Sequence, residues 1–223
     1  KNYDLLTGTS MAAPHVAGLA GLILAKNSSN FAMTNGEVMG QIRFTAEDIN
    51  SSTYSGDDNF IGDGRINAYL ALTTSGSPRI IFDRSIIDDG KTISSANDGD
   101  GIIEPGEKIK LTVYLKNEWI NATSVTGTLT TTNSNITISD SSASFGSISG
   151  GQTGNNSSDQ FVFDVQTGAP TRERIDWTLN VTAQYNSGAS VYTTGLHFSL
   201  YIGKFILLVD DDNDILRIFC GWL

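Results

Sequence analysis

Hydrophobic positions change their spacing along the chain, from helical patterns in the first third to strict alternation afterwards. Residues 14–24 are almost all apolar or small, which is typical of a helix that is buried on all sides. Proline is tolerated near a helix start, where its missing N–H costs little, so Pro14 predicts that this helix begins near Ser10 or Met11. We therefore expect a core helix close to the start of the chain.

Two further helices are predicted before residue 75. Thr34 and Glu37 have the spacing of a capping box, which opens a helix. A glycine-rich turn at 62–64 precedes apolar residues at helical spacing through 66–72. The polar segment 74–78, rich in Ser and Gly, then reads as a linker.

After the linker, apolar residues occupy every second position in several short runs. Such runs, separated by Gly, Asn and Ser turns, indicate an antiparallel β-sandwich. We expect Trp177, in the middle of one run, to fill the core, whereas Trp119 at a strand end suits either the core or a binding surface. The polar stretch 149–159 is predicted to be an exposed hairpin loop. The predicted strands include residues 80–82, 109–115, 125–131, 136–138, 161–165, 175–185 and 198–202.

A chain of 223 residues is long enough for two compact units. The patterns place the first unit at residues 1–75 and the sandwich at 76–203. Residues 204–223 read as the start of a further, truncated domain or as a tail. There an apolar run meets an acidic cluster at 210–214, as in the first strand of an α/β domain, but a last strand with a solvated acidic turn fits as well.

The net charge limits the kinds of molecule that the protein can bind, and the cysteine content limits how it can be stabilised. The formal net charge is −10, from 14 basic and 24 acidic residues. This balance argues against nucleic acid and anionic membranes, which require basic patches. No apolar run approaches the ~20 residues of a membrane span. The single Cys220 cannot form an internal disulfide, so we expect packing, and a metal ion, to supply stability.

The segment 97–107, NDGDGIIEPGE, is a candidate calcium loop. Oxygen ligands packed among glycines are what a hard cation requires. The alternative is a metal-free, Asx-rich turn in which Pro105 and Gly106 set the entry to the next strand. The expected ligands are, in order of preference, Asp98, Asp100, Glu107, Asn97 and Glu104.

The predicted start of the first helix also carries candidate chemistry. Ser10 would place its hydroxyl at a helix N-terminus, where free N–H groups and the positive end of the dipole favour developing negative charge. An acyl-transfer nucleophile requires that environment. The alternative is that Ser10 or Thr9 merely caps the helix.

The whole string GTSMAAPHVAG at residues 8–18 resembles the serine motif of subtilisin-like serine peptidases. The resemblance implies that Ser10 is the nucleophile and that its own N–H is one oxyanion donor. It implies no catalytic role for His15. The string at 62–72 is similar to the turn and last helix of the same family, so the resemblance covers about the first third of the chain. It implies an α/β fold with a parallel sheet, of which this chain holds a mainly helical C-terminal part.

The resemblance also implies parts that this chain lacks. The family order is Asp, His, Ser, with an oxyanion Asn between His and Ser. These groups would precede Lys1, and His197 lies too far downstream to replace the base. We therefore expect a C-terminal fragment of a longer endopeptidase of polypeptide substrates, inactive without its upstream part. The segment from Asp98 resembles immunoglobulin-like modules of secreted bacterial proteases, which implies a secreted or cell-surface location.

Two other functions stay open at this stage. The sandwich suits a non-catalytic binding or spacer module for adhesion, carbohydrate or substrate. The serine-bearing part suits a degenerate, inactive homologue. Upstream Asp-Thr/Ser-Gly and His-Gly motifs would favour the peptidase, whereas their absence would favour binding.

Overall fold

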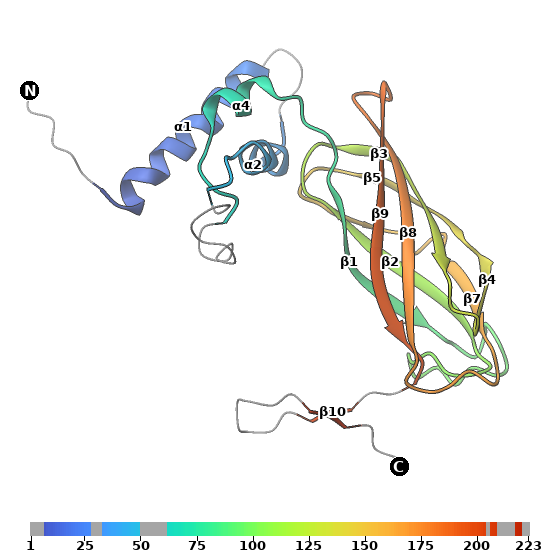
Figure 1. The fold of residues 1–223 in the computed structure, drawn as a ribbon. Coiled ribbons are helices and arrows are strands. Elements are labelled where there is room, and N and C mark those ends of the chain that lie inside the picture. The colour runs from blue at the N-terminus through green and yellow to red at the C-terminus, as the bar shows by residue number, and fades with distance from the viewer. Residues whose placement is uncertain (1–6, 28–32, 50–61, 204–205, 209–216, 220–223) are drawn as a thin grey trace, which may run out of the picture.

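The structure, a computed structural model, consists of a small group of helices beside an elongated pair of β-sheets (Figure 1). It describes residues 7–27, 33–49, 62–203, 206–208 and 217–219.

Three helices form the N-terminal part: α1 (Thr9–Asn27), α2 (Asn35–Phe44) and α4 (Ala68–Thr73). The predicted capping box is confirmed, since the Glu37 N–H donates to Thr34 Oγ1 at 3.2 Å and the Thr34 N–H donates to Glu37 Oε2 at 2.8 Å. Asn67 caps α4 by accepting the N–H of Leu70 at 2.9 Å. Short polar side chains therefore set the starts of both helices.

The apolar helix α1 is covered on one side only by the described residues. Leu19 and Ile23 are buried with Ala71 of α4, whereas Leu22 of the same helix is 54% exposed. We expected α1 to be buried on all sides, but the described residues bury only one side of it. Two short helices can cover only one stripe of a third helix.

The described part of residues 1–75 is mainly helical, as expected, and holds no strand of the parallel sheet that the resemblance implies for the whole domain. Besides its helices, this part contains one antiparallel bridge between Glu47 and Arg65.

Two antiparallel sheets make up the rest of the main body. One sheet has the order β1–β2–β7–β4, with β6 also pairing with β2, and the other has the order β5–β3–β8–β9. The bounds are β1 (Ile80–Asp88), β2 (Lys108–Asn117), β3 (Ala122–Thr131), β4 (Ile136–Asp140), β5 (Ser142–Ile148), β6 (Thr153–Asn155), β7 (Phe161–Val165), β8 (Arg174–Tyr185) and β9 (Ser190–Tyr201). All seven strands predicted from alternation are confirmed.

Strands β5 and β6 were not predicted, and β6 falls in the segment expected to be an exposed hairpin loop. That expectation is wrong for its centre, because β6 pairs with β2 and Asn156 beside it is fully buried. The segment 149–159 is polar because hydrogen bonds, rather than apolar contacts, attach it to β2.

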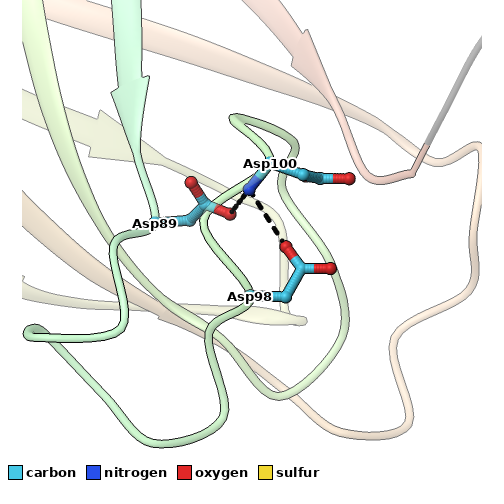
Figure 2. Close-up of side chains that lie close together, drawn as sticks. All are labelled: Asp89, Asp98 and Asp100. Atoms are coloured by element: carbon cyan, nitrogen blue, oxygen red, sulfur yellow. Dashed lines mark hydrogen bonds between the residues drawn. The ribbon is translucent and has the colours of Figure 1, made fainter.

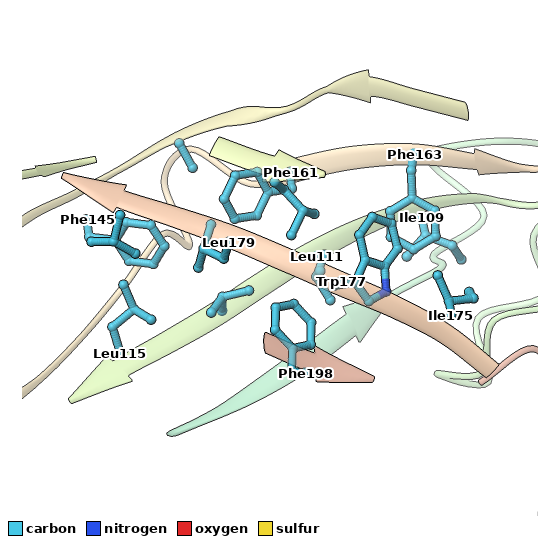
Figure 3. Packing of buried hydrophobic residues seen from close by; sticks show 14 of the residues in the cluster. Ile109, Leu111, Leu115, Phe145, Phe161, Phe163, Ile175, Trp177, Leu179 and Phe198 are labelled. Atoms are coloured by element: carbon cyan, nitrogen blue, oxygen red, sulfur yellow. The ribbon is translucent and has the colours of Figure 1, made fainter. Parts of the chain in front are cut away.

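One hydrophobic core fills the space between the two sheets (Figure 3). Ile109, Leu111 and Phe163 come from the first sheet, and Trp177 and Leu179 from the second. Trp177 is 1% exposed and packs against Phe163 at a centroid distance of 5.0 Å, which confirms its predicted core role. Apolar side chains from both sheets thus bury each other, as in a β-sandwich.

After the sandwich, β10 (Ile206–Leu208) pairs antiparallel with β11 (Arg217–Phe219). The acidic run 210–214 and Cys220 lie outside the described residues. Among the helices that the structure describes, none has the length and apolar character needed to cross a lipid bilayer.

Candidate active-site serine and candidate metal loop

Ser10 lies in the first turn of α1 and is exposed to solvent. Gly8 precedes the helix with a φ of 144°, and its carbonyl accepts the N–H groups of Met11 at 3.0 Å and Ala12 at 3.2 Å. The N–H of Ser10 comes before these donors and belongs to the groups that a helix leaves without an internal acceptor. The hydroxyl and a free N–H therefore lie together at the positive end of α1, as the sequence predicted.

This arrangement suits stabilisation of an anion beside the hydroxyl. Backbone N–H groups at a helix N-terminus are fixed before any reaction, so they stabilise an oxyanion without reorganising. The hydroxyl still requires a base to accept its proton.

Neither histidine of the chain serves as that base in the structure. The Nδ1 atom of His15 lies 2.8 Å from the carbonyl oxygen of Met11 on the same helix, so this nitrogen carries a hydrogen and donates it. His197 lies on β9 with Nδ1 3.1 Å from Thr178 Oγ1 of β8. Within the described residues, the side chains thus provide a serine at a helix start but no base in contact with it.

The second candidate site is the loop between β1 and β2. Carboxylate oxygens of Asp89, Asp98 and Asp100 lie within 4.8 Å of one another. Figure 2 shows these three side chains and the hydrogen bonds by which Asp89 and Asp98 accept the N–H of Asp100. Asp89, at the end of β1, is buried, and its two oxygens accept the N–H groups of Gly99, Asp100 and Gly101 at 3.0–3.1 Å. These hydrogen bonds hold the backbone of residues 99–101 around the Asp89 carboxylate.

A second acidic group overlaps the first. Carboxylate oxygens of Asp98, Glu104 and Glu107 also lie within 4.8 Å of one another. Glu107 is 3% exposed and accepts the N–H of Glu104 at 2.9 Å and that of Asp98 at 3.4 Å. Burial raises the pKa of the Glu107 carboxyl above its ordinary value, and the nearby charges of Asp89 and Glu104 raise this pKa further.

Asn97, another predicted ligand, has a structural contact of its own. Its side-chain amide donates to the carbonyl of Lys108 at 2.7 Å and accepts the N–H of Lys108 at 3.1 Å. The Asn97 side chain therefore makes with the backbone of Lys108, the first residue of β2, the two hydrogen bonds that a neighbouring strand would make.

The structure thus places the four predicted acidic residues in two groups that share Asp98, one with Asp100 and the other with Glu104 and Glu107, and it adds Asp89 to the first group. Sequence reasoning missed Asp89 because it lies outside the 97–107 string. The one local signal was the Asp88-Asp89-Gly90 string, which has the composition of a turn. The set of carboxylate oxygens is of the kind that calcium binds.

Comparisons with known proteins bear on the first part of the chain. Residues 1–64 match the model of the Subtilase family. The halolysin-like extracellular serine protease Nep of Natrialba magadii is 44% identical over 73 residues, which are 33% of this chain and 12% of that protein. The thermophilic serine proteinase of Bacillus sp. (strain AK1) is 41% identical over 71 residues, or 32% of this chain and 15% of that protein.

The chain therefore spans only a small share of the length of its curated relatives.

Among solved structures, the sporulation control protein Spo0M from Bacillus subtilis matches with a TM-score of 0.27 and 15% identity, covering 58% of this chain and 51% of that one. The family match and the identities together show that the first third of the chain is similar in sequence to subtilisin-like serine peptidases.

Proposed function

We propose that this chain is the nucleophile-bearing part of a subtilisin-like serine endopeptidase, joined to an accessory β-sandwich. The observation that carries the proposal is the exposed Ser10 at the N-terminus of α1, inside the segment that matches the Subtilase family. Ser10 Oγ would attack the scissile carbonyl of a polypeptide, and the Ser10 N–H would donate to the oxyanion that forms. The base that accepts the Ser10 hydroxyl proton would return this proton to the leaving amine as the intermediate collapses, and water would then hydrolyse the acyl-enzyme.

The base and its orienting carboxylate must come from residues other than His15 and His197. His15 already donates to the backbone of its own helix, and His197 lies in the sandwich. We propose that the Asp, the His and the oxyanion Asn are supplied by an upstream part of the peptidase domain. Residues 1–223 alone would then be inactive.

A secreted or cell-surface location is part of the same proposal. It is supported by the relative Nep, which is described as extracellular. The sequence resemblance of the segment from Asp98 to immunoglobulin-like modules of secreted bacterial proteases favours the same location.

Labelling by a fluorophosphonate probe, which requires an activated serine, tests the nucleophile. A longer polypeptide that supplies the Asp and His should be labelled at Ser10 and should cleave casein, and residues 1–223 alone should do neither. In the longer polypeptide, Ser10→Ala should abolish labelling and reduce turnover by about 10⁶-fold, the value known for subtilisin. Ser95→Ala, which alters an exposed serine of the sandwich, is the matched control. Unchanged cleavage by Ser10→Ala would exclude Ser10 as the nucleophile.

We also propose a structural calcium ion in the loop between β1 and β2. Asp98 and Asp100 would be its principal ligands, with Glu104, Glu107 and Asp89 nearby. Asn97 would contribute through the strand contact that it makes with Lys108. Such an ion would neutralise carboxylates that otherwise repel one another.

A further inference from the structure

The helices and the sandwich meet through a buried polar contact. Gln41 of α2 is 5% exposed, and its Nε2 donates to the carbonyls of Ala71 and Thr74, both at 2.9 Å. Its Oε1 accepts the Nε1–H of Trp119, two residues after the end of β2, at 3.1 Å. One buried amide thus joins α2, the C-terminal end of α4 and the sandwich.

Glu37, one turn earlier on α2, makes a second contact of this kind. It is 8% exposed, and its Oε2 closes the capping box with Thr34. Its Oε1 accepts the N–H of Asn121, the residue before β3, at 3.4 Å. The glutamate that closes the capping box of α2 therefore also binds the sandwich.

The two backbones approach so closely that only glycine fits between them. A Cβ atom added to Gly40 would lie 2.7 Å from the carbonyl oxygen of Glu118 and 2.8 Å from Trp119 Cδ1. One added to Gly36 would lie 2.1 Å from the carbonyl oxygen of Gly150. Side chains do not tolerate such distances, so α2 rests directly on the backbone of the sandwich loops.

Aromatic and charged groups surround this contact. The rings of Phe44 and Trp119 lie 5.3 Å apart, and the guanidinium of Arg79 lies 4.5 Å from the centroid of the Phe44 ring. The Glu118 carboxylate lies 3.8 Å from Arg43 and 3.4 Å from Arg79. Polar, aromatic and backbone contacts therefore combine in a single interface.

The interface continues to the helix that carries Ser10. Gln41 holds the carbonyl of Ala71, and the Ala71 side chain is buried with Leu19 and Ile23 of α1. An unbroken series of contacts therefore runs from Trp119 of the sandwich to α1. Packed contacts of this kind transmit stability between elements.

We infer that the β-sandwich is a fixed brace for the serine-bearing helices rather than a module on a free tether. It docks through α2, and it stabilises α1 through α4. This goes beyond the proposed peptidase activity and does not rest on it, because the interface stands whether or not Ser10 is a nucleophile.

Gly40→Ala in the 223-residue chain tests this inference by the sign of its effect on hydrogen exchange. In a helix without tertiary contacts, Gly→Ala stabilises and should slow amide exchange by about fivefold. If α2 is docked as described, the new methyl group meets Glu118 and Trp119, and exchange in α2 and α4 should instead accelerate about tenfold or more. Slower or unchanged exchange in α2 would overturn the inference.

Matched variants separate docking from general effects. Gly21→Ala lies in α1 with nothing within 4 Å of the added Cβ, so it should slow exchange in α1. Amides of β8 should keep their protection in Gly40→Ala, which shows that the sandwich still folds.

Trp119→Phe probes the hydrogen bond to Gln41 without a new clash. It removes the Nε1–H donor and leaves the buried Gln41 Oε1 without it, so exchange in α2 should accelerate. Tyr69→Phe, at a side chain 74% exposed on α4, is the control and should change nothing. Equal exchange in the two variants would contradict the brace.

Discussion

The side-chain oxygen of Asn156 accepts the N–H of Val113 at 2.7 Å, and both residues are completely buried. Along β2, residues 108–111 pair with β7 and residues 114–116 pair with β6. Val113 lies between these two pairings. Asn156 therefore supplies, from a side chain, the hydrogen bond that a continuous neighbouring strand would supply from its backbone.

Asn156→Ala should destabilise the chain by about 1–3 kcal/mol, because it leaves the buried N–H of Val113 without an acceptor. Urea unfolding followed by tryptophan fluorescence measures this free energy. Ser158→Ala, in the exposed turn next to it, should change stability by less than about 0.5 kcal/mol. A neutral Asn156→Ala would mean that water or another group replaces the amide.

Calcium should raise the melting temperature of the sandwich by several degrees relative to chelator. An ion that binds only the folded state stabilises it by about 2.7 kcal/mol at a hundredfold excess over its dissociation constant. Scanning calorimetry of the 223-residue chain with calcium and with chelator measures the difference.

The double substitution Asp98→Asn and Asp100→Asn should erase this calcium response. Asn retains the oxygens that accept the N–H groups of Asp100 and Ile102, so the turns persist while the charges are lost. Asp83→Asn, at an exposed pair with Arg84, is the control. Coincident melting curves of the unmodified chain in calcium and chelator would show that the loop is metal-free.

Glu107 should make the chelator-treated protein less stable as pH rises. The pKa of its carboxyl is raised in the folded state above the ordinary value of 4.5, so the folded protein holds this proton more tightly than the unfolded chain does. The resulting stability is fully present below pH 4.5 and is lost as pH rises through the folded pKa.

Glu107→Gln should remove this loss, so the stability difference between variant and unmodified protein should grow with pH above 4.5 in chelator. Calcium should reduce that difference, because a cation favours the ionised carboxylate. Urea unfolding at a series of pH values measures it, and a difference independent of pH would show that Glu107 is not responsible.

Local interactions were readable from the sequence alone. The capping box of Thr34 and Glu37, the start of α1 around Ser10 and the alternating strands follow from neighbouring residues and a fixed period. The motif around Ser10 lies within residues 1–64, which match the Subtilase family. Four of the acidic residues of the candidate calcium loop were found because they lie within one short string.

Contacts between distant residues were decided only by the tertiary structure. Asp89 joins the acidic loop because β1 ends opposite it, and Asn156 is buried because two strands leave a gap along β2. The segment 74–78 reads as a linker, yet a Cβ atom on its Gly76 would lie 2.4 Å from Ile120 of the sandwich. No local pattern carries this information, because it depends on which surfaces meet once the sheets and helices have formed.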